Sequence, residues 1–337
     1  MACTPEACTS AQTAAASGSS SHQTRTRRCT NAAKTASNAS ASAAPGGAEG
    51  GYPVTISSCG RDHTFDKAPS RVVVGNENTL RTLDALSVSA AVHGYVLSPD
   101  SAGQAPTGLP ENLVQVSATT IPAREPVIAA KPDLFLSFNE AQLTTQGALS
   151  YDDLAGAGAN AYVMGAYCAQ NPDNSSIDTV YTDITNLGKI FGVSGRAQEL
   201  NETLKNQVAA AKESLNGSTA TVANLKVAGE KVYAVGGYPA SAVTDALGLK
   251  NQFADLPTPF AELSAEQALA MAPDVVFVNH AGDEQAAIDQ LKQALPDLKA
   301  IRDGHVHGLD ENGPQGGGVG VIAALESVSA DVKTSAK

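Results

Sequence analysis

A helical segment, a Pro-Asp break and an apolar strand follow one another twice in this chain of 337 residues. The first copy is EPVIAAKPDLFLSF at 125–138, and the second is EQALAMAPDVVFVN at 266–279. Proline ends a helix because it lacks a backbone N–H and clashes with the preceding turn, so each helix stops before its strand begins. The repeat predicts one equivalent helix–strand unit in each half of the chain, and a duplicated fold is enough to explain it.

Other apolar runs alternate with amphipathic helices around both units. The run RVVVG at 71–75 is β-branched and ends in glycine, which favours a buried parallel strand. The clearest helix covers 175–191, where apolar residues from Ile177 to Phe191 form one stripe. This alternation predicts an α/β fold with mostly parallel sheets covered by helices on both faces. The other expected strands include 54–57, 90–95, 134–138, 231–237 and 305–309, and the other expected helices include 77–88, 192–217 and 321–332.

The first 50 residues differ in composition from the rest of the chain. They contain no Leu, Ile, Val, Phe or Tyr, so we expect a disordered tail that buries too little apolar surface to fold. The basic RTRR at 25–28 precedes a stretch too polar for a signal peptide. No run of 18 apolar residues predicts a membrane span. The formal charge of −12 disfavours binding to nucleic acid.

Motifs of common enzyme classes are absent from the sequence. It has no G-x-S-x-G, no phosphate-binding loop and no G-x-G-x-x-G after a strand. Its five cysteines show no C-x-x-C spacing, so no zinc site is expected. His305 and His307 lie two apart on an expected strand and would share a face, which leaves a metal site as an alternative.

Four segments, in order, resemble those of substrate-binding proteins of ABC importers for ferric siderophores and cobalamin, most closely the actinobacterial branch. The similar segments are CGRDHTFDKAPSRVVV (59–74), EPVIAAKPDL (125–134), SAEQALAMAPDVVFV (264–278) and IRDGHVHGLD (301–310). The resemblance covers residues 54–332. No one segment is specific, and their order carries the resemblance.

The resemblance implies two Rossmann-like α/β lobes joined by one long helix, with the ligand between the lobes. The expected division is a tail at 1–50, an N-terminal lobe at 51–172, a connecting helix at 173–192 and a C-terminal lobe at 193–337. It also implies an extracytoplasmic, monomeric receptor that is not an enzyme, has no intrinsic cofactor and delivers its ligand to an ABC permease dimer. Cys3 is the candidate lipid anchor to the outer face of the membrane, and an incidental cysteine is the alternative.

Ligands of open α/β sheets bind outside the carboxyl ends of the strands. There we expect a ferric siderophore, with cobalamin, haem, a free divalent metal ion or a chelatase-like enzyme activity as alternatives. The acidic charge and the scarcity of Arg at the strand ends disfavour an anionic catecholate chelate and favour a neutral or cationic hydroxamate chelate or a corrinoid. The absence of Trp departs from the family, whose receptors usually present several aromatic residues, and weakens any choice of ligand. His93 and Tyr95 are expected just after a strand, and Phe260 on a loop. The expected cleft residues are Asn76, Glu77, Asn78, His93, Tyr95, Asn139, Glu140, Tyr167, Tyr238, Phe260, Asn279 and His280.

Two further pairs of residues receive expected roles. One pair follows from the resemblance, and the other follows from the expected export of the protein. In the family, one glutamate on each lobe docks with an arginine pocket on the permease, and by motif these residues are Glu125 and Glu266. The alternative is that both are ordinary acids that favour a helix N-terminus. Cys59 and Cys168 are the two cysteines of the folded part, so export favours a disulfide between them, with two buried thiols as the alternative.

Overall fold

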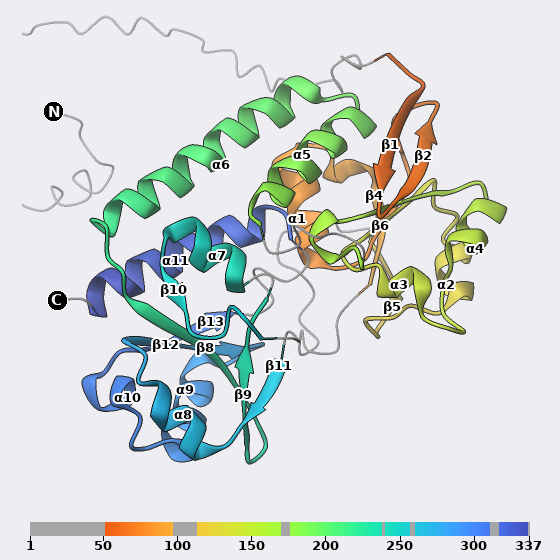
Figure 1. The fold of residues 1–337 in the computed structure, drawn as a ribbon. Helices are drawn as coiled ribbons and strands as arrows, with labels where there is room; N and C mark the ends of the chain where they lie inside the picture. Colours follow the sequence, from red (N-terminus) through yellow and green to blue (C-terminus); the bar gives the residue numbers. More distant parts are fainter. Residues whose placement is uncertain are drawn as a thin grey trace, which may run out of the picture. The chain divides into compact units, whose positions relative to one another are not determined.

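Two β-sheets, one in each half of the chain, organise the fold (Figure 1). They are seen in a computed structural model that describes residues 51–96, 113–169, 176–237, 240–256, 260–310 and 317–335. The predicted tail at 1–50, with Cys3, lies outside these residues. Within the described ranges, no helix has both the length and the apolar character that a membrane span needs.

The first sheet has five parallel strands in the order β5-β4-β3-β6-β7. Alternate residues point to opposite faces, so Val72 and Val74 of β3 enter one apolar core while Val73 enters another. The parallel sheet predicted for the first half is therefore confirmed, with both faces buried. Its strands are β3 Val72–Val74, β4 Val92–Val96, β5 Val114–Ser117, β6 Leu134–Ser137 and β7 Asn160–Val163.

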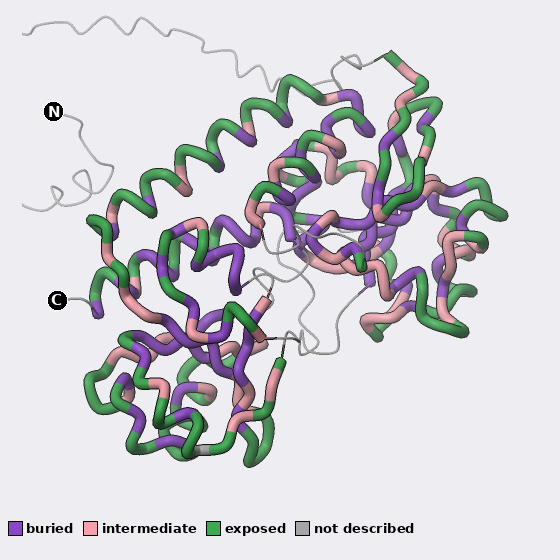
Figure 2. The backbone as a smooth tube through the Cα atoms, in the orientation of Figure 1, coloured by how far each residue is buried: buried purple, intermediate pink, exposed green. Residues whose placement is uncertain are grey.

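An antiparallel hairpin precedes this sheet, and short helices connect its strands. Figure 2 shows buried chain concentrated in the strands and exposed chain on the outer turns. The hairpin consists of β1 Val54–Ser58 and β2 Arg61–Phe65. The helices of the first half are α1 Glu77–Ala85, α2 Arg124–Ala129, α3 Ala141–Thr144 and α4 Tyr151–Gly156, with 3-10 turns η2 Ser89–Ala91 and η4 Gly165–Tyr167.

The second sheet is mixed, with the order β11-β9-β8-β12-β13 and β10 paired to β8. Strand β8 was not predicted, because Thr221, Asn224 and Lys226 interrupt its apolar pattern. It lies in the centre of the sheet, parallel to β12 and antiparallel to β9, and Asn224 is buried there. The strands are β8 Thr221–Ala228, β9 Lys231–Val235, β10 Lys250–Asn251, β11 Phe260–Leu263, β12 Val275–His280 and β13 Val306–Asp310.

Two consecutive helices link the halves, α5 Asp178–Ile190 and α6 Ser194–Ser214. Helix α5 occupies the predicted connector at 173–192 but packs against β1 and η4 of the first half. The longer α6 packs against α5, and it also packs against α7 and α11 of the second half. The chain continues from α6 into β8 (Figure 1). The remaining helices are α7 Ala240–Leu247, α8 Ala265–Met271, α9 Glu284–Ala294, α10 Lys299–Asp303 and α11 Val319–Ser335.

The aspartates of the two Pro-Asp breaks make equivalent hydrogen bonds in the two sheets. Asp133 accepts hydrogen bonds from the backbone N–H groups of Ser70 (2.7 Å) and Arg71 (2.9 Å), just before β3. Asp274 accepts from the backbone N–H and the hydroxyl of Thr221, each at 2.8 Å, at the start of β8. Each aspartate thus ties the start of its own strand to the start of the neighbouring parallel strand, which gives the sequence repeat a structural reason.

A disulfide joins Cys59 to Cys168, and their Cα atoms lie 5.1 Å apart. Beside it the Ser58 hydroxyl donates to the Val163 carbonyl (3.0 Å) and accepts from the Val163 N–H (2.9 Å). The bridge therefore fastens the turn of the β1–β2 hairpin to the segment that follows β7. The predicted pairing is confirmed.

Candidate functional site

Polar side chains gather where the parallel strands of the first sheet end. After β3, the Asn76 side chain accepts from the Thr79 N–H (3.0 Å) and caps α1. Glu77 forms an ion pair with Arg81, and Asn78 is buried. The cap explains the sharp strand-to-helix turn, because it satisfies an N–H that the first helical turn leaves unpaired. Three predicted site residues thus lie together at this edge, although Asn78 is enclosed.

A buried glutamine, which no pattern in the sequence singles out, lies at the centre of this edge. The Gln142 amide donates to the carbonyls of Gly75 (3.1 Å) and Thr120 (2.7 Å), and its oxygen accepts from the Ser137 hydroxyl (2.7 Å). A Cβ at Gly75 would lie 2.3 Å from the Gln142 oxygen, so only glycine fits there. Gln142 therefore holds together the segments that follow β3, β5 and β6. No sequence pattern could predict this, because the backbone carbonyls that Gln142 contacts are distant along the chain.

Replacing Gln142 with leucine should loosen this edge. Gln142→Leu removes three hydrogen bonds from a fully buried site, so we expect a loss of about 2–3 kcal/mol in unfolding free energy. Ligand affinity should fall with it, because the loops around the site lose their common anchor. Chemical denaturation measures the first effect and calorimetric titration the second. The control is Gln198→Leu, since Gln198 is exposed on α6; equal behaviour of the two variants would contradict the role of Gln142.

The ends of β6 and β7 bring Asn139, Glu140 and Tyr167 together, as predicted. The Glu140 carboxylate accepts from the Ala169 N–H (2.7 Å), and the Glu140 N–H donates to the Tyr167 carbonyl (3.3 Å). The Tyr167 ring meets Phe138 edge to face, with centroids 6.0 Å apart. Hydrogen bonds therefore join the residues after β6 to those after β7, and this edge carries a carboxylate and an aromatic ring.

Two predicted site residues of the first half lie elsewhere than expected. His93 and Tyr95 fall within β4, which extends to Val96, rather than after the strand. Both are half-buried, and Tyr95 packs against the larger apolar core. The expected strand at 90–95 already contains both residues and ends one residue before β4 does, so the expectation that they follow the strand was wrong.

The second sheet contributes residues at the end of β12 and the start of β11. The Asn279 amide donates to the Leu225 carbonyl (3.2 Å), and a His280 ring nitrogen lies 2.9 Å from the Gly282 carbonyl. Phe260 begins β11 opposite Val235 instead of lying on a loop, and it is 52% exposed. Tyr238 lies outside the described residues.

The histidines considered for a metal site have other partners. His305 precedes β13 and lies 3.2 Å from the Asp274 carbonyl, whereas His307 is 2.9 Å from the Ser335 hydroxyl. No group of three His, Cys, Asp or Glu side chains within the described ranges could hold a metal ion. His305 also lines a cavity of about 210 Å³ with Asp274 and Lys299. That cavity lies at the amino ends of β8, β12 and β13, away from the candidate site.

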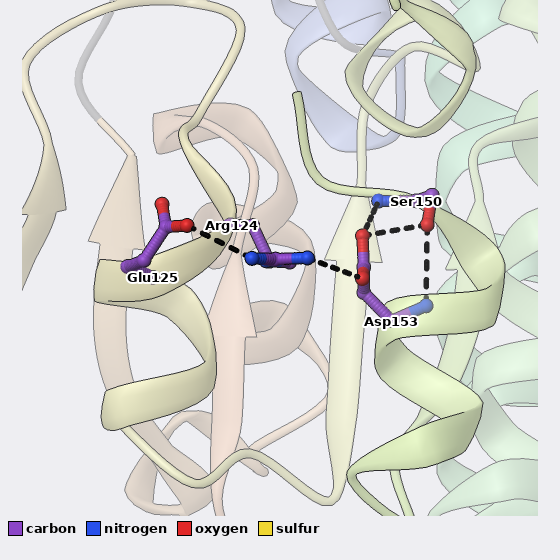
Figure 3. A network of polar contacts seen from close by, with 4 residues as sticks. All are labelled: Arg124, Glu125, Ser150 and Asp153. Atoms are coloured by element: carbon purple, nitrogen blue, oxygen red, sulfur yellow. Dashed lines mark hydrogen bonds and ion pairs between the residues drawn. The ribbon is translucent and has the colours of Figure 1, made fainter. Parts of the chain in front are cut away.

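The two candidate docking glutamates occupy matching places, each in the first turn of its helix. Glu125 on α2 is 73% exposed, and Glu266 on α8 is exposed. Figure 3 shows Arg124 between Glu125 and Asp153, with Asp153 bound to Ser150. Both side chains are therefore exposed, but Glu125 is paired with a cation, whereas Glu266 forms no ion pair with any described residue.

Two α/β sheets, each with polar residues at the carboxyl ends of parallel strands, define the class of two-lobed binding proteins. Residues 72–312 match the family model described as Periplasmic binding protein, so the chain belongs to that family. The family consists of non-enzymatic, extracytoplasmic transport receptors, which supports the prediction that this chain is not an enzyme. A comparison with curated protein sequences gives no match.

Solved structures with the same fold bind different ligands. An ABC-type Fe3+-hydroxamate transport system protein from Saccharomonospora viridis is 25% identical, with a TM-score of 0.67 over 84% of this chain and 99% of that one. A periplasmic heme-binding protein from Roseiflexus is 21% identical (TM-score 0.65, 80% and 99% covered). A periplasmic vitamin B12 binding protein from Vibrio cholerae is 17% identical (TM-score 0.61, 80% and 98% covered). The last two support the fold alone.

Proposed function

We propose that this chain is the substrate-binding protein of an ABC importer and that it captures a ferric siderophore. The observation that carries the proposal is the match of residues 72–312 to the Periplasmic binding protein family. The similarity to the Fe3+-hydroxamate transport protein over most of both chains supports an iron chelate as the ligand. The resemblance to the actinobacterial branch is part of this proposal.

The ligand site that we propose combines the carboxyl edge of the first sheet with the ends of β11 and β12. Glu77 is paired with Arg81, so Glu140, which has a backbone N–H as its partner, is the carboxylate that makes the first edge acidic. This charge favours a neutral or cationic chelate such as a ferric hydroxamate over an anionic catecholate. Tyr167 and the exposed Phe260 offer flat apolar surfaces to such a ligand. Haem or a corrinoid is the second candidate, favoured by the fold shared with the heme- and B12-binding proteins.

The remaining parts of the proposal concern the placement of the receptor in the cell. We propose lobes at 51–172 and 193–337, a lipid anchor at Cys3, and docking of Glu125 and Glu266 to a permease dimer. The contacts of α5 with the first half favour α6 as the longer link between the lobes. A carboxylate on each lobe, facing positive charges on the permease, would let one partner recognise both lobes at once.

A thermal-shift screen of the purified protein tests the ligand. The panel contains ferric hydroxamates, ferric catecholates, haem, cobalamins and free divalent metal ions. A ligand at 100 times its dissociation constant adds about 2.7 kcal/mol to the unfolding free energy, so the melting temperature should rise by several degrees. We expect a shift with a ferric hydroxamate and none with its iron-free form.

Other outcomes of the same screen are equally informative. A shift with haem or cobalamin alone would replace the siderophore with the second candidate. A shift with bare metal ions alone would overturn chelate binding. Chemical conversion of any bound ligand would contradict the assignment as a receptor.

A further inference from the structure

The two docking glutamates have different electrostatic surroundings, although the sequence repeat places them identically. Arg124 precedes Glu125, whereas Ala265 precedes Glu266. The guanidinium of Arg124 lies 3.2 Å from Oε1 of Glu125. Within the described ranges Glu266 forms no ion pair. One carboxylate is therefore occupied in the free protein, and the other is open.

A second carboxylate holds Arg124 in place. Nη1 of Arg124 lies 3.5 Å from Oδ1 of Asp153, while Nη2 faces Glu125 (Figure 3). Asp153 is itself fixed, because its Oδ2 accepts from the Ser150 N–H (3.1 Å) and hydroxyl (2.6 Å) in the capping box of α4. These hydrogen bonds and the guanidinium of Arg124 lower the pKa of Asp153, so it stays charged. Arg124 would keep a partner if Glu125 left it.

The position of Arg124 is not explained by helix stability. It is the first residue of α2, where a cation opposes the helix dipole. Its side chain is 55% exposed, so it contributes little apolar packing. At this position Arg124 places its guanidinium beside Glu125. A guanidinium is also the group that the proposed permease pocket would present to Glu125.

We propose that Arg124 is a displaceable internal partner of Glu125 that makes the two docking glutamates unequal. Glu266 engages a basic pocket of the permease directly, whereas Glu125 engages only when a permease guanidinium displaces Arg124 toward Asp153. Arg124 is thus a positioning residue that weakens docking at one lobe and gives the receptor a preferred orientation on a two-subunit partner. This inference rests on the proposed function, because it requires docking through both glutamates.

A double-mutant cycle on docking tests the displacement. The probe is the ABC permease of the source organism in lipid nanodiscs, and the dissociation constant is measured for wild type, Arg124→Ala, Glu125→Gln, Arg124→Ala with Glu125→Gln, and Glu266→Gln. Arg124→Ala should tighten docking about two- to fivefold, the strength of an exposed ion pair. Glu125→Gln should weaken docking more in the Arg124→Ala background than in wild type. In wild type, docking must break the Arg124–Glu125 ion pair, which offsets part of the gain from the contact between Glu125 and the permease. Without Arg124 there is no such offset, so the substitution removes the whole contribution of that contact.

The control is Lys292→Ala, which makes the same change in net charge on α9, where Lys292 is exposed beside Asp289. Equal effects of Arg124→Ala and Lys292→Ala, with no coupling to Glu125, would overturn the proposal. Weaker docking of Arg124→Ala would also overturn it, since Arg124 would then contact the permease. If neither glutamine variant weakens docking in any background, the docking assignment fails and the inference with it. Unchanged melting temperatures confirm that the variants fold.

Discussion

Removal of the Cys59–Cys168 bridge should lower the unfolding free energy by about 4–5 kcal/mol, the value that chain entropy predicts for a loop of this length. The two cysteines are 109 residues apart, so the bridge restricts a large part of the unfolded chain. The double variant Cys59→Ser, Cys168→Ser should therefore melt on the order of 10 °C below wild type in a calorimetric scan. Cys59 and Cys168 pack beside the core of Val73 and Phe135, so the loss also weakens local order.

Reduction provides the matched control for this prediction. Wild type in reductant should melt close to the double variant, whereas the double variant should not respond to reductant. A double variant that melts with wild type would show that the loop is already restricted in the unfolded state, contrary to the prediction.

One buried carboxyl group should contribute about 2–3 kcal/mol more to the unfolding free energy at pH 5 than at pH 8. Asp183 on α5 is 2% exposed, and burial raises its pKa to about 7. Tyr162 (2.7 Å) and the Gly165 N–H (3.0 Å) donate to it and lower the pKa, but burial has the larger effect. These contacts also fasten α5 to the end of β7.

The sign follows from proton binding. Between the ordinary aspartate pKa of 3.8 and about 7, the folded protein holds a proton on Asp183 that the unfolded chain has lost. This contribution is therefore present at low pH and disappears as the pH rises through 7. His63 acts oppositely, because burial lowers its pKa and its protonation favours the unfolded chain below pH 6.5. The two residues can be separated by substitution.

Denaturation curves of wild type and Asp183→Asn from pH 5 to pH 8 make this measurement. The difference between the two proteins should depend on pH, while the contribution of His63 cancels. Tyr162→Phe is the control: it removes a donor that favours the carboxylate, so the pH dependence should persist with its midpoint at higher pH. A wild-type curve parallel to that of Asp183→Asn would contradict the assignment.

Strands made of an unbroken run of apolar residues could be predicted from the sequence. Strands that contain polar residues, and that form only because flanking strands pair with them, could not. The runs at 71–75 and 134–138 became β3 and β6, buried on both faces. Strand β8 was missed because Asn224 is polar, yet its two flanking strands bury it. Strand β5 was not predicted either; it is short, and its Val114 is exposed while Val116 is buried. These two segments form strands because they pair with other strands, and a short stretch of sequence carries no information about such pairing.

The candidate site divides in the same way. Local patterns predicted that Asn76, Glu140 and Tyr167 lie at one edge of the sheet, because polar residues after buried parallel strands share that edge. Their role in ligand binding stays a prediction. The Gln142 network and the Arg124–Asp153 contact join segments that are about 20 to 70 residues apart, so no local pattern contains them.

The sequence by itself determined the duplicated helix–strand unit, the α/β class and the positions of Glu125 and Glu266, because these depend on spacing along the chain. The tertiary structure alone decided that Asp133 and Asp274 tie neighbouring strands, that Gln142 joins distant segments at the edge of the first sheet, and that Arg124 pairs with Glu125. The physical reason is that hydrogen bonds and ion pairs form between atoms within about 3 Å, and such neighbours are set by the packing of distant segments.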